Sequence, residues 1–145
     1  MDHFLLRSII GAHSKVPTEH LYLETGALPI PHIIRIRRLC YLKTLLQRPE
    51  SEITRKVYES QKRKVTKGDW FETVQKDKEI LEISMNDEEI EKMHSEDYKA
   101  MVKDKVRKSA FKELEQMKDS HIKVRENEYK ASAPGLVVIM DTKSK

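Results

Sequence analysis

The stretch LYLETGALPIPHIIRIRRLCYLKTLL, residues 21–46, decides the fold that we predict for this chain. Apolar residues recur at helical spacing on both sides of a turn that contains Gly26 and two prolines. Glycine readily ends a helix, and proline fixes φ in the first turn of the next one. We therefore predict a short helix over residues 18–25 and a longer helix over about residues 30–47.

The residues of the longer helix divide between an apolar face and a basic face. Arg35 and Arg38 are predicted to fall largely on the basic face, whereas Arg37 is predicted to lie closest to the apolar face. We expect the aliphatic side chains to form core and the arginines to be available to a ligand. The predicted apolar face comprises Ile30, Ile33, Ile34, Cys40, Tyr41, Leu42, Leu45 and Leu46.

Two further helices flank this stretch. Residues 3–10 form a short apolar segment that Gly11 is expected to end, since glycine suits the left-handed position after a helix. Downstream, Ser51 is expected to cap a helix whose apolar residues continue at three-to-four spacing. That helix should fray at the cationic triplet Lys62-Arg63-Lys64.

Capping signals predict where the next helices begin. Asp69 is followed three residues later by Glu72, the pattern of a capping box, so a helix should start here and close at Ile83. Asn86 should cap a short acidic helix over residues 87–93, because acidic side chains favour the positive end of the helix dipole.

The longest predicted helix runs from Glu96 to about His121, where apolar residues recur without glycine or proline. Its lysines alternate with acidic residues, which favours surface ion pairs over RNA contacts. The chain is therefore expected to be all-α, an irregular bundle of about five to seven helices with a long C-terminal helix. We predict a single helical domain over residues 1–130 and a loose, flexible tail over residues 131–145.

Composition limits the chain to one modest core. Its 145 residues are 38% apolar and 36% charged, with no apolar run long enough to span a membrane and no basic leader at the N-terminus. An intracellular location, cytoplasmic or nuclear, is expected.

Cys40 is the single cysteine, so neither an intrachain disulfide nor a cysteine zinc cage is possible within the chain. Trp70, the single tryptophan, is expected to anchor the core rather than to stack on a base.

Positive charge is concentrated in the first half of the chain. Residues 1–68 hold 13 Lys and Arg against 6 Asp and Glu, whereas residues 69–145 hold 15 against 18. Between His32 and Lys67 the excess is 11 against 3. Clustered basic residues gain affinity for a phosphate backbone by releasing its counterions, although such a cluster is equally typical of a solvated helix surface.

The residues needed for catalysis are missing from the sequence. A polymerase requires aspartates that converge on paired divalent ions, and no aromatic-x-Asp-Asp turn occurs. His20 and Glu24 share a helical face, but two candidate ligands are weak evidence for a metal. There is no glycine-rich phosphate loop, and no Ser or Cys has the context of a nucleophile. We expect no enzymatic activity, no cofactor and no metal.

A family resemblance adds to this interpretation. The chain resembles, over residues 4–130, the region that follows the polymerase domain in non-LTR (LINE-like) retrotransposon reverse-transcriptase proteins. The specific phrase is YLETGALPI, and the supporting segments are LLRSIIGAHSKVPTEHLYLETGALPIPHIIRIRRLCYLKTLLQR, EITRKVYESQK, GDWFETVQKDKEIL and VKDKVRKSAFKELEQMK. The tail ASAPGLVVIMDTKSK departs from the family pattern, and the expected downstream Cys/His cluster is absent.

The resemblance implies association with template RNA or target DNA. It carries over no catalytic residue, because the matching positions would lie upstream of Met1, and it implies a truncated copy of the parent protein. Two hypotheses remain open. In the first, the chain is a non-catalytic segment that binds nucleic acid. In the second, it is an interaction or scaffold remnant that packed against the parental polymerase domain. The second hypothesis predicts an exposed apolar patch and self-association. The basic residues expected to contact phosphates are Arg35, Arg37, Arg38, Lys62, Arg63 and Lys64.

Overall fold

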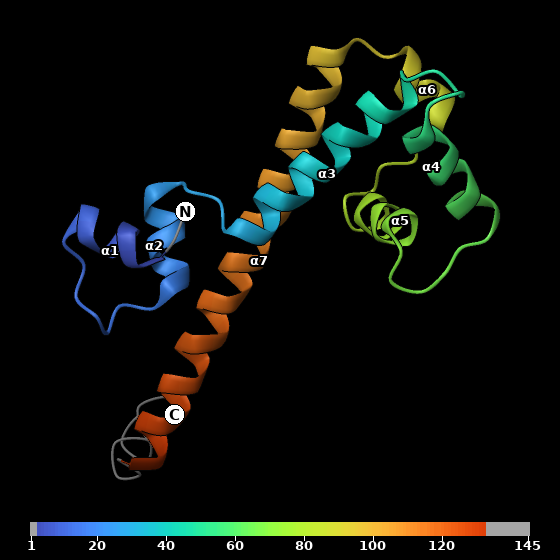
Figure 1. The fold of residues 1–145 in the computed structure, drawn as a ribbon. Coiled ribbons are helices and arrows are strands. Elements are labelled where there is room, and N and C mark those ends of the chain that lie inside the picture. Colours follow the sequence, from blue (N-terminus) through green and yellow to red (C-terminus); the bar gives the residue numbers. More distant parts are fainter. Residues whose placement is uncertain (1–2, 133–145) are drawn as a thin grey trace. The chain divides into compact units, whose positions relative to one another are not determined.

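The computed structural model describes residues 3–132, and within that range the helices are joined by turns and loops, with no strand (Figure 1). The all-α fold class, the irregular bundle and the long C-terminal helix are thereby confirmed. Most of the predicted tail, residues 133–145, lies outside the described residues. The helices are α1 (His3–Ile10), α2 (Thr18–Thr25), α3 (Ile30–Leu46), α4 (Ile53–Arg63), α5 (Trp70–Ile80), α6 (Asp87–Lys92) and α7 (Ser95–Ser132).

The described chain divides into two compact units. The larger unit is Leu28–Ala110, which includes α3 to α6 and the first part of α7. The smaller unit combines His3–Ala27 with the chain from Phe111 onward. That residues 1–130 behave as a single domain stays a prediction.

Leucines of α3 and valines of α7 form the centre of the larger unit. Leu39, Leu42, Val102 and Val106 are fully buried in one cluster. Tyr98 of α7 is buried beside them, and its hydroxyl donates a hydrogen bond of 3.0 Å to the Leu39 carbonyl. Burial raises the pKa of this phenol well above its ordinary value. The hydroxyl therefore stays protonated and fixes α7 against α3.

The predicted apolar face of α3 is partly wrong. The structure buries Leu42, Leu45 and Leu46 as expected, but it also buries Leu39 and leaves Ile30, Ile34 and Tyr41 about half exposed. The buried face is therefore rotated toward Leu39. The cause is tertiary, since α5 and α7 cover one side of α3 and the isoleucines fall outside the contact.

The predicted cap of α6 is confirmed, that of α5 is half right, and that of α4 is wrong. Asn86 forms a reciprocal capping box with Glu89. The Asp69 side chain accepts from the Glu72 backbone N–H at 2.7 Å, but the Glu72 carboxylate accepts from the Gly68 N–H rather than from that of Asp69, so the predicted reciprocal box does not form. Ser51 does not cap α4. Glu52 occupies the N-cap position, without a side-chain hydrogen bond.

Helix α5 ends at Ile80 rather than at Ile83, because the chain turns there in a Schellman motif. The Ile83 N–H donates to the Lys78 carbonyl at 2.8 Å, and the Glu82 N–H donates to the Glu79 carbonyl at 3.1 Å. Glu82 adopts a positive φ of 53°. Ile83 is buried just beyond the helix, as the apolar residue after this motif commonly is. The periodicity thus identified a core residue that is not helical.

A glycine at position 82 should stabilise the larger unit. The left-handed conformation costs a residue with a Cβ about 1 kcal/mol, so Glu82→Gly should raise the free energy of unfolding by up to about 1 kcal/mol. Urea unfolding followed by Trp70 fluorescence measures this change. Glu79→Gly is the matched control inside α5, and it should lower the same free energy by about 0.5 to 1 kcal/mol. A loss of stability in both variants would contradict the explanation.

The smaller unit has a core of its own. Leu6 of α1, Tyr22 of α2 and Leu114 of α7 are buried together. Gly26 ends α2 as predicted, with φ of 67° and its N–H donating to the Tyr22 carbonyl at 2.9 Å. The buried carboxylate of Glu19 lies against His121 Nδ1, which ties α2 to α7.

Helix α7 is longer than predicted. It continues from His121 to Ser132, at the end of the described residues. Most side chains beyond Leu114 are exposed, so apolar periodicity is weak there, yet glycine and proline first recur at Pro134. The helix therefore persists through residues that make no core.

Candidate nucleic-acid interface and an adjoining apolar pocket

Three of the six predicted phosphate-contacting residues make ion pairs within the larger unit, and two of them, Arg35 and Arg38, share one carboxylate. Arg35 Nε lies 3.0 Å from one carboxylate oxygen of Asp77, and Arg38 Nη1 contacts the other. The Asp77 side chain is 6% exposed, whereas those of Arg35 and Arg38 are 21% and 23% exposed. This arrangement joins α3 to α5, so the prediction that both arginines lie on a face away from the packed side of α3 is wrong. Asp77 was not identified from the sequence.

Arg37 has the opposite environment from the one predicted. Its side chain is exposed rather than close to the apolar face, and among the described residues it makes no ion pair. The charged residues that act on the thiol of Cys40, one turn further along α3, are Lys103 and Lys99 of α7, so they add positive charge there and do not compensate that of Arg37. Arg37 is therefore the arginine of α3 that keeps an uncompensated charge at the surface.

The cationic triplet lies at the C-terminal end of α4. Arg63 and Lys64 are exposed and make no ion pair within the described residues. Lys62 is also exposed, but its Nζ lies 2.7 Å from Asp87 Oδ2. No acidic residue occurs between Ser60 and Gly68, a segment that also contains Lys67. The triplet is the largest concentration of available positive charge among the six predicted residues.

Asp87 partly neutralises the triplet. Burial opposes its ionisation, but the hydrogen bonds from Lys62 and from the Tyr58 hydroxyl outweigh burial and hold the pKa of Asp87 below its ordinary value. The carboxylate is thus charged at neutral pH and anchors α4 to α6. Arg63 and Lys64 make no such contact with Asp87.

Lys43 is a basic residue that sequence reasoning left without a role. Its side chain is buried, and its ammonium group donates to the carbonyls of Ile90 at 2.6 Å, Glu91 at 3.2 Å and Met93. These carbonyls lie at the C-terminal end of α6, where helix carbonyls lack intrahelical partners. The available signal was the position of Lys43 four residues after Leu39 and three before Leu46, because this spacing places it on the same helical face as two leucines.

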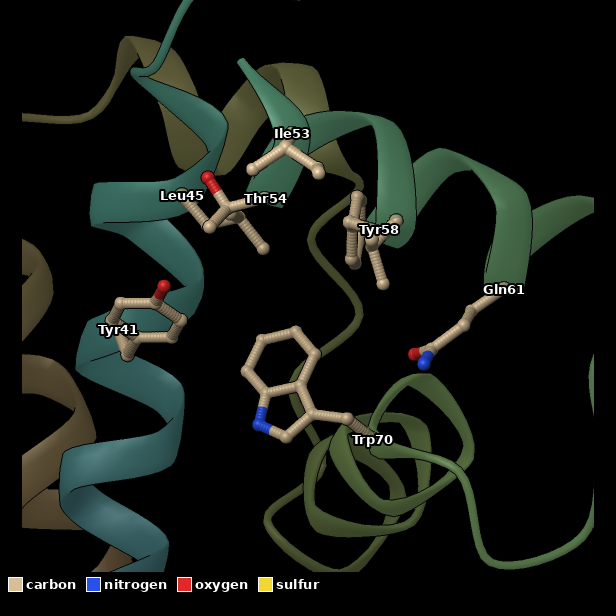
Figure 2. Close-up of a pocket in the computed structure, with 8 residues that line it drawn as sticks. Tyr41, Leu45, Ile53, Thr54, Tyr58, Gln61 and Trp70 are labelled. Carbon is tan, nitrogen blue, oxygen red and sulfur yellow. The ribbon is translucent and has the colours of Figure 1, made fainter.

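An apolar pocket opens beside the basic end of α4 (Figure 2). It has a volume of about 250 Å³ and lies between α3, α4 and α5. Its polar lining residues are Thr54 and Gln61. Figure 2 shows Tyr41 and Leu45 on α3, Trp70 at the start of α5, and Ile53, Thr54, Tyr58 and Gln61 on α4. Its apolar and aromatic lining residues are Tyr41, Leu45, Ile53, Val57, Tyr58 and Trp70.

Trp70 contributes both to the core and to this pocket. It packs against the buried cluster of the larger unit, as expected of a core anchor. The Trp70 ring also lies 5.9 Å from that of Tyr41 at an interplanar angle of 85°, and 6.1 Å from that of Tyr58 at 73°. Edge-to-face contacts of this kind hold the indole in place while leaving it at the pocket wall.

Cys40 has the properties of an inert thiol. It is half-buried on α3, and burial raises its pKa despite the nearby ammonium groups of Lys103 and Lys99. A protonated thiol is a poor nucleophile and a poor metal ligand.

Within residues 3–132, no group of three or more His, Cys, Asp and Glu side chains is arranged to hold a metal ion. None of the described helices combines the length and the apolar character that crossing a membrane requires. Comparison of the chain with protein-family models, with curated proteins and with solved structures finds no match.

Proposed function

We propose that this chain binds the phosphate backbone of RNA or DNA without catalysing a reaction on it. The contact residues are Arg63 and Lys64, with Lys62 and Lys67 beside them and Arg37 as a separate contact on α3. Arg35 and Arg38 support the interface indirectly, because they hold α3 against α5. The resemblance to retrotransposon reverse-transcriptase proteins points to the same class of partner.

The observation that carries this proposal is the uncompensated charge at the end of α4. Arg63 and Lys64 are exposed, without ion-pair partners among the described residues, in a segment that has four basic and no acidic side chains between Ser60 and Gly68. Exposed lysines elsewhere in the larger unit are often paired, as Lys76 is with Glu72 and Lys108 with Asp104. Unpaired cations gain most from replacing counterions on a phosphate backbone.

A second candidate function is a protein-interaction segment that packed against a parental polymerase domain. It is favoured by the apolar side chains that the larger unit exposes, since Ile53 is 77% and Val57 51% exposed next to Tyr41. Exposed apolar patches of this kind commonly mark protein contacts. This candidate predicts self-association and weak binding of nucleic acid.

The double variant Arg63→Gln/Lys64→Gln tests backbone binding. It should weaken binding of a labelled RNA or DNA duplex about tenfold at low salt, because two phosphate contacts are lost. The slope of log affinity against log salt should become shallower by about 1.5 to 2. Fluorescence anisotropy titrations at several salt concentrations measure both quantities.

The matched control is Lys76→Gln/Lys108→Gln, which removes the same charge from lysines that have ion-pair partners. It should change the slope by less than about 0.5, since paired lysines release fewer counterions. Equal effects of the two double variants would mean that net charge alone governs binding. Unchanged affinity in the Arg63/Lys64 variant would remove the proposed interface.

A further inference from the structure

We propose that the apolar pocket between α3, α4 and α5 takes up one unpaired base of a single-stranded nucleic acid. The base would lie against the rings of Tyr41 and Trp70 while its flanking phosphates lie along the cationic triplet. This inference rests on the proposed function, because the triplet supplies the backbone contacts. It adds a second contact, with the base, that an anion lacking bases cannot make.

The position of the pocket is the first support for this inference. Gln61 lines the pocket and is followed directly by Lys62-Arg63-Lys64, so the apolar wall and the basic segment adjoin on α4. Proteins that bind single strands combine aromatic platforms for bases with neighbouring positive charge for phosphates. Here Gln61 joins the two parts, while the rings offered to the base come from Tyr41 of α3 and Trp70 of α5.

The size and lining of the pocket suit a single base. Its volume of about 250 Å³ is below the roughly 300 to 1,000 Å³ of pockets for drug-sized ligands, so it accommodates one flat ring system. Tyr41 is 41% exposed and offers ring surface at the entrance. Figure 2 shows Tyr41 and Trp70 reaching the pocket from different helices.

Unused hydrogen-bonding groups distinguish a base from an aliphatic side chain as the occupant. The Gln61 side-chain oxygen accepts from the Phe71 N–H at 3.1 Å, which fixes the amide, while its nitrogen has no partner among the described residues. The Tyr41 hydroxyl and the Trp70 indole N–H are likewise unpaired in that part of the chain. The edge of a base supplies acceptors for such donors, whereas a leucine side chain supplies none.

The test uses the fact that Trp70 is the only tryptophan, so that the intrinsic fluorescence of the chain reports on the pocket wall. Oligothymidylate should quench Trp70 emission, because a stacked base quenches an indole, whereas linear polyphosphate of equal charge should leave it unchanged. Oligothymidylate should also bind about tenfold more tightly than polyphosphate, given the affinity that stacking of one base contributes.

Two variants locate the effect. Val57→Phe should fill the pocket, and Tyr41→Ala should remove the ring at its entrance. Each should reduce the affinity for oligothymidylate about tenfold and leave that for polyphosphate unchanged. Ile80→Phe is the matched control, since Ile80 is an equally exposed aliphatic residue of α5 outside this pocket. It should alter neither affinity.

Several results would overturn the inference. If oligothymidylate and polyphosphate bind equally well and neither quenches Trp70, the pocket takes no base while backbone binding stands. If neither ligand binds, the proposed function fails as well. If an acidic amphipathic peptide shifts Trp70 emission and oligothymidylate does not, the pocket is a protein-docking site.

Discussion

Replacing Lys43 by methionine should lower the free energy of unfolding of the larger unit by about 3 kcal/mol. Methionine keeps most of the length and packing of the side chain but removes all of its donors. The carbonyls of Ile90, Glu91 and Met93 would then remain at least partly buried without the ammonium group that now satisfies them. A buried acceptor left unpaired costs about 1 to 3 kcal/mol, which outweighs the desolvation energy regained by removing the charge.

Lys92→Met makes the same chemical change on the exposed side of the last turn of α6. It should alter stability by less than about 0.5 kcal/mol. Urea unfolding followed by Trp70 fluorescence compares the two variants, because Trp70 belongs to the same unit. Similar small losses in both would show that water reaches the α6 carbonyls and that Lys43 does not cap the helix.

Replacing Asp77 by asparagine should lower the free energy of unfolding by about 2 to 3 kcal/mol. Asparagine keeps the shape of the side chain but leaves Arg35 and Arg38 as two neighbouring cations without their shared counterion. Removing one partner of a fully buried ion pair costs about 3 to 5 kcal/mol, and the partial exposure of both arginines reduces that cost. The loss should be largest at low salt, where repulsion between the arginines is least screened.

The exposed pair of Arg48 and Glu52 provides the comparison. The two side chains are 39% and 45% exposed, and Arg48 Nη1 lies 3.3 Å from Glu52 Oε2. Glu52→Gln should therefore lower the free energy of unfolding by less than about 1 kcal/mol. Thermal unfolding by circular dichroism and urea unfolding by fluorescence report both variants. An Asp77→Asn variant as stable as Glu52→Gln would show that Arg35 and Arg38 do not need Asp77 as a counterion for the stability of the unit.

Local signals in the sequence located the helices well. Gly26 and the capping side chains of Asp69 and Asn86 act within four residues of their partners, so their effects could be predicted without knowing the fold. The predicted C-terminal ends of helices were wrong where packing against distant residues explained an apolar residue, or where the sequence held no signal for the end. Ile83 is buried beyond a Schellman turn, and α7 continues to Ser132 without core contacts to mark its length.

The candidate site was predicted less completely than the fold. Periodicity identified a basic face on α3 but assigned Arg37 to the wrong environment, because it could not indicate which neighbour would cover the helix. Asp77 is 42 residues from Arg35 along the chain, and no local pattern connects them. The pocket likewise depends on side chains of three helices that only the tertiary structure brings together.

The sequence by itself determined that this chain is helical, where most of its helices begin, and that positive charge is concentrated before residue 68. These properties follow from backbone preferences and composition, which act over a few residues. Only the tertiary structure decided which basic side chains stay available. Asp77 takes up Arg35 and Arg38 and the α6 carbonyls take up Lys43, whereas Arg63 and Lys64 remain exposed beside an aromatic pocket. The physical reason is that an ion pair or a pocket depends on groups that are distant along the chain and close only after the helices pack.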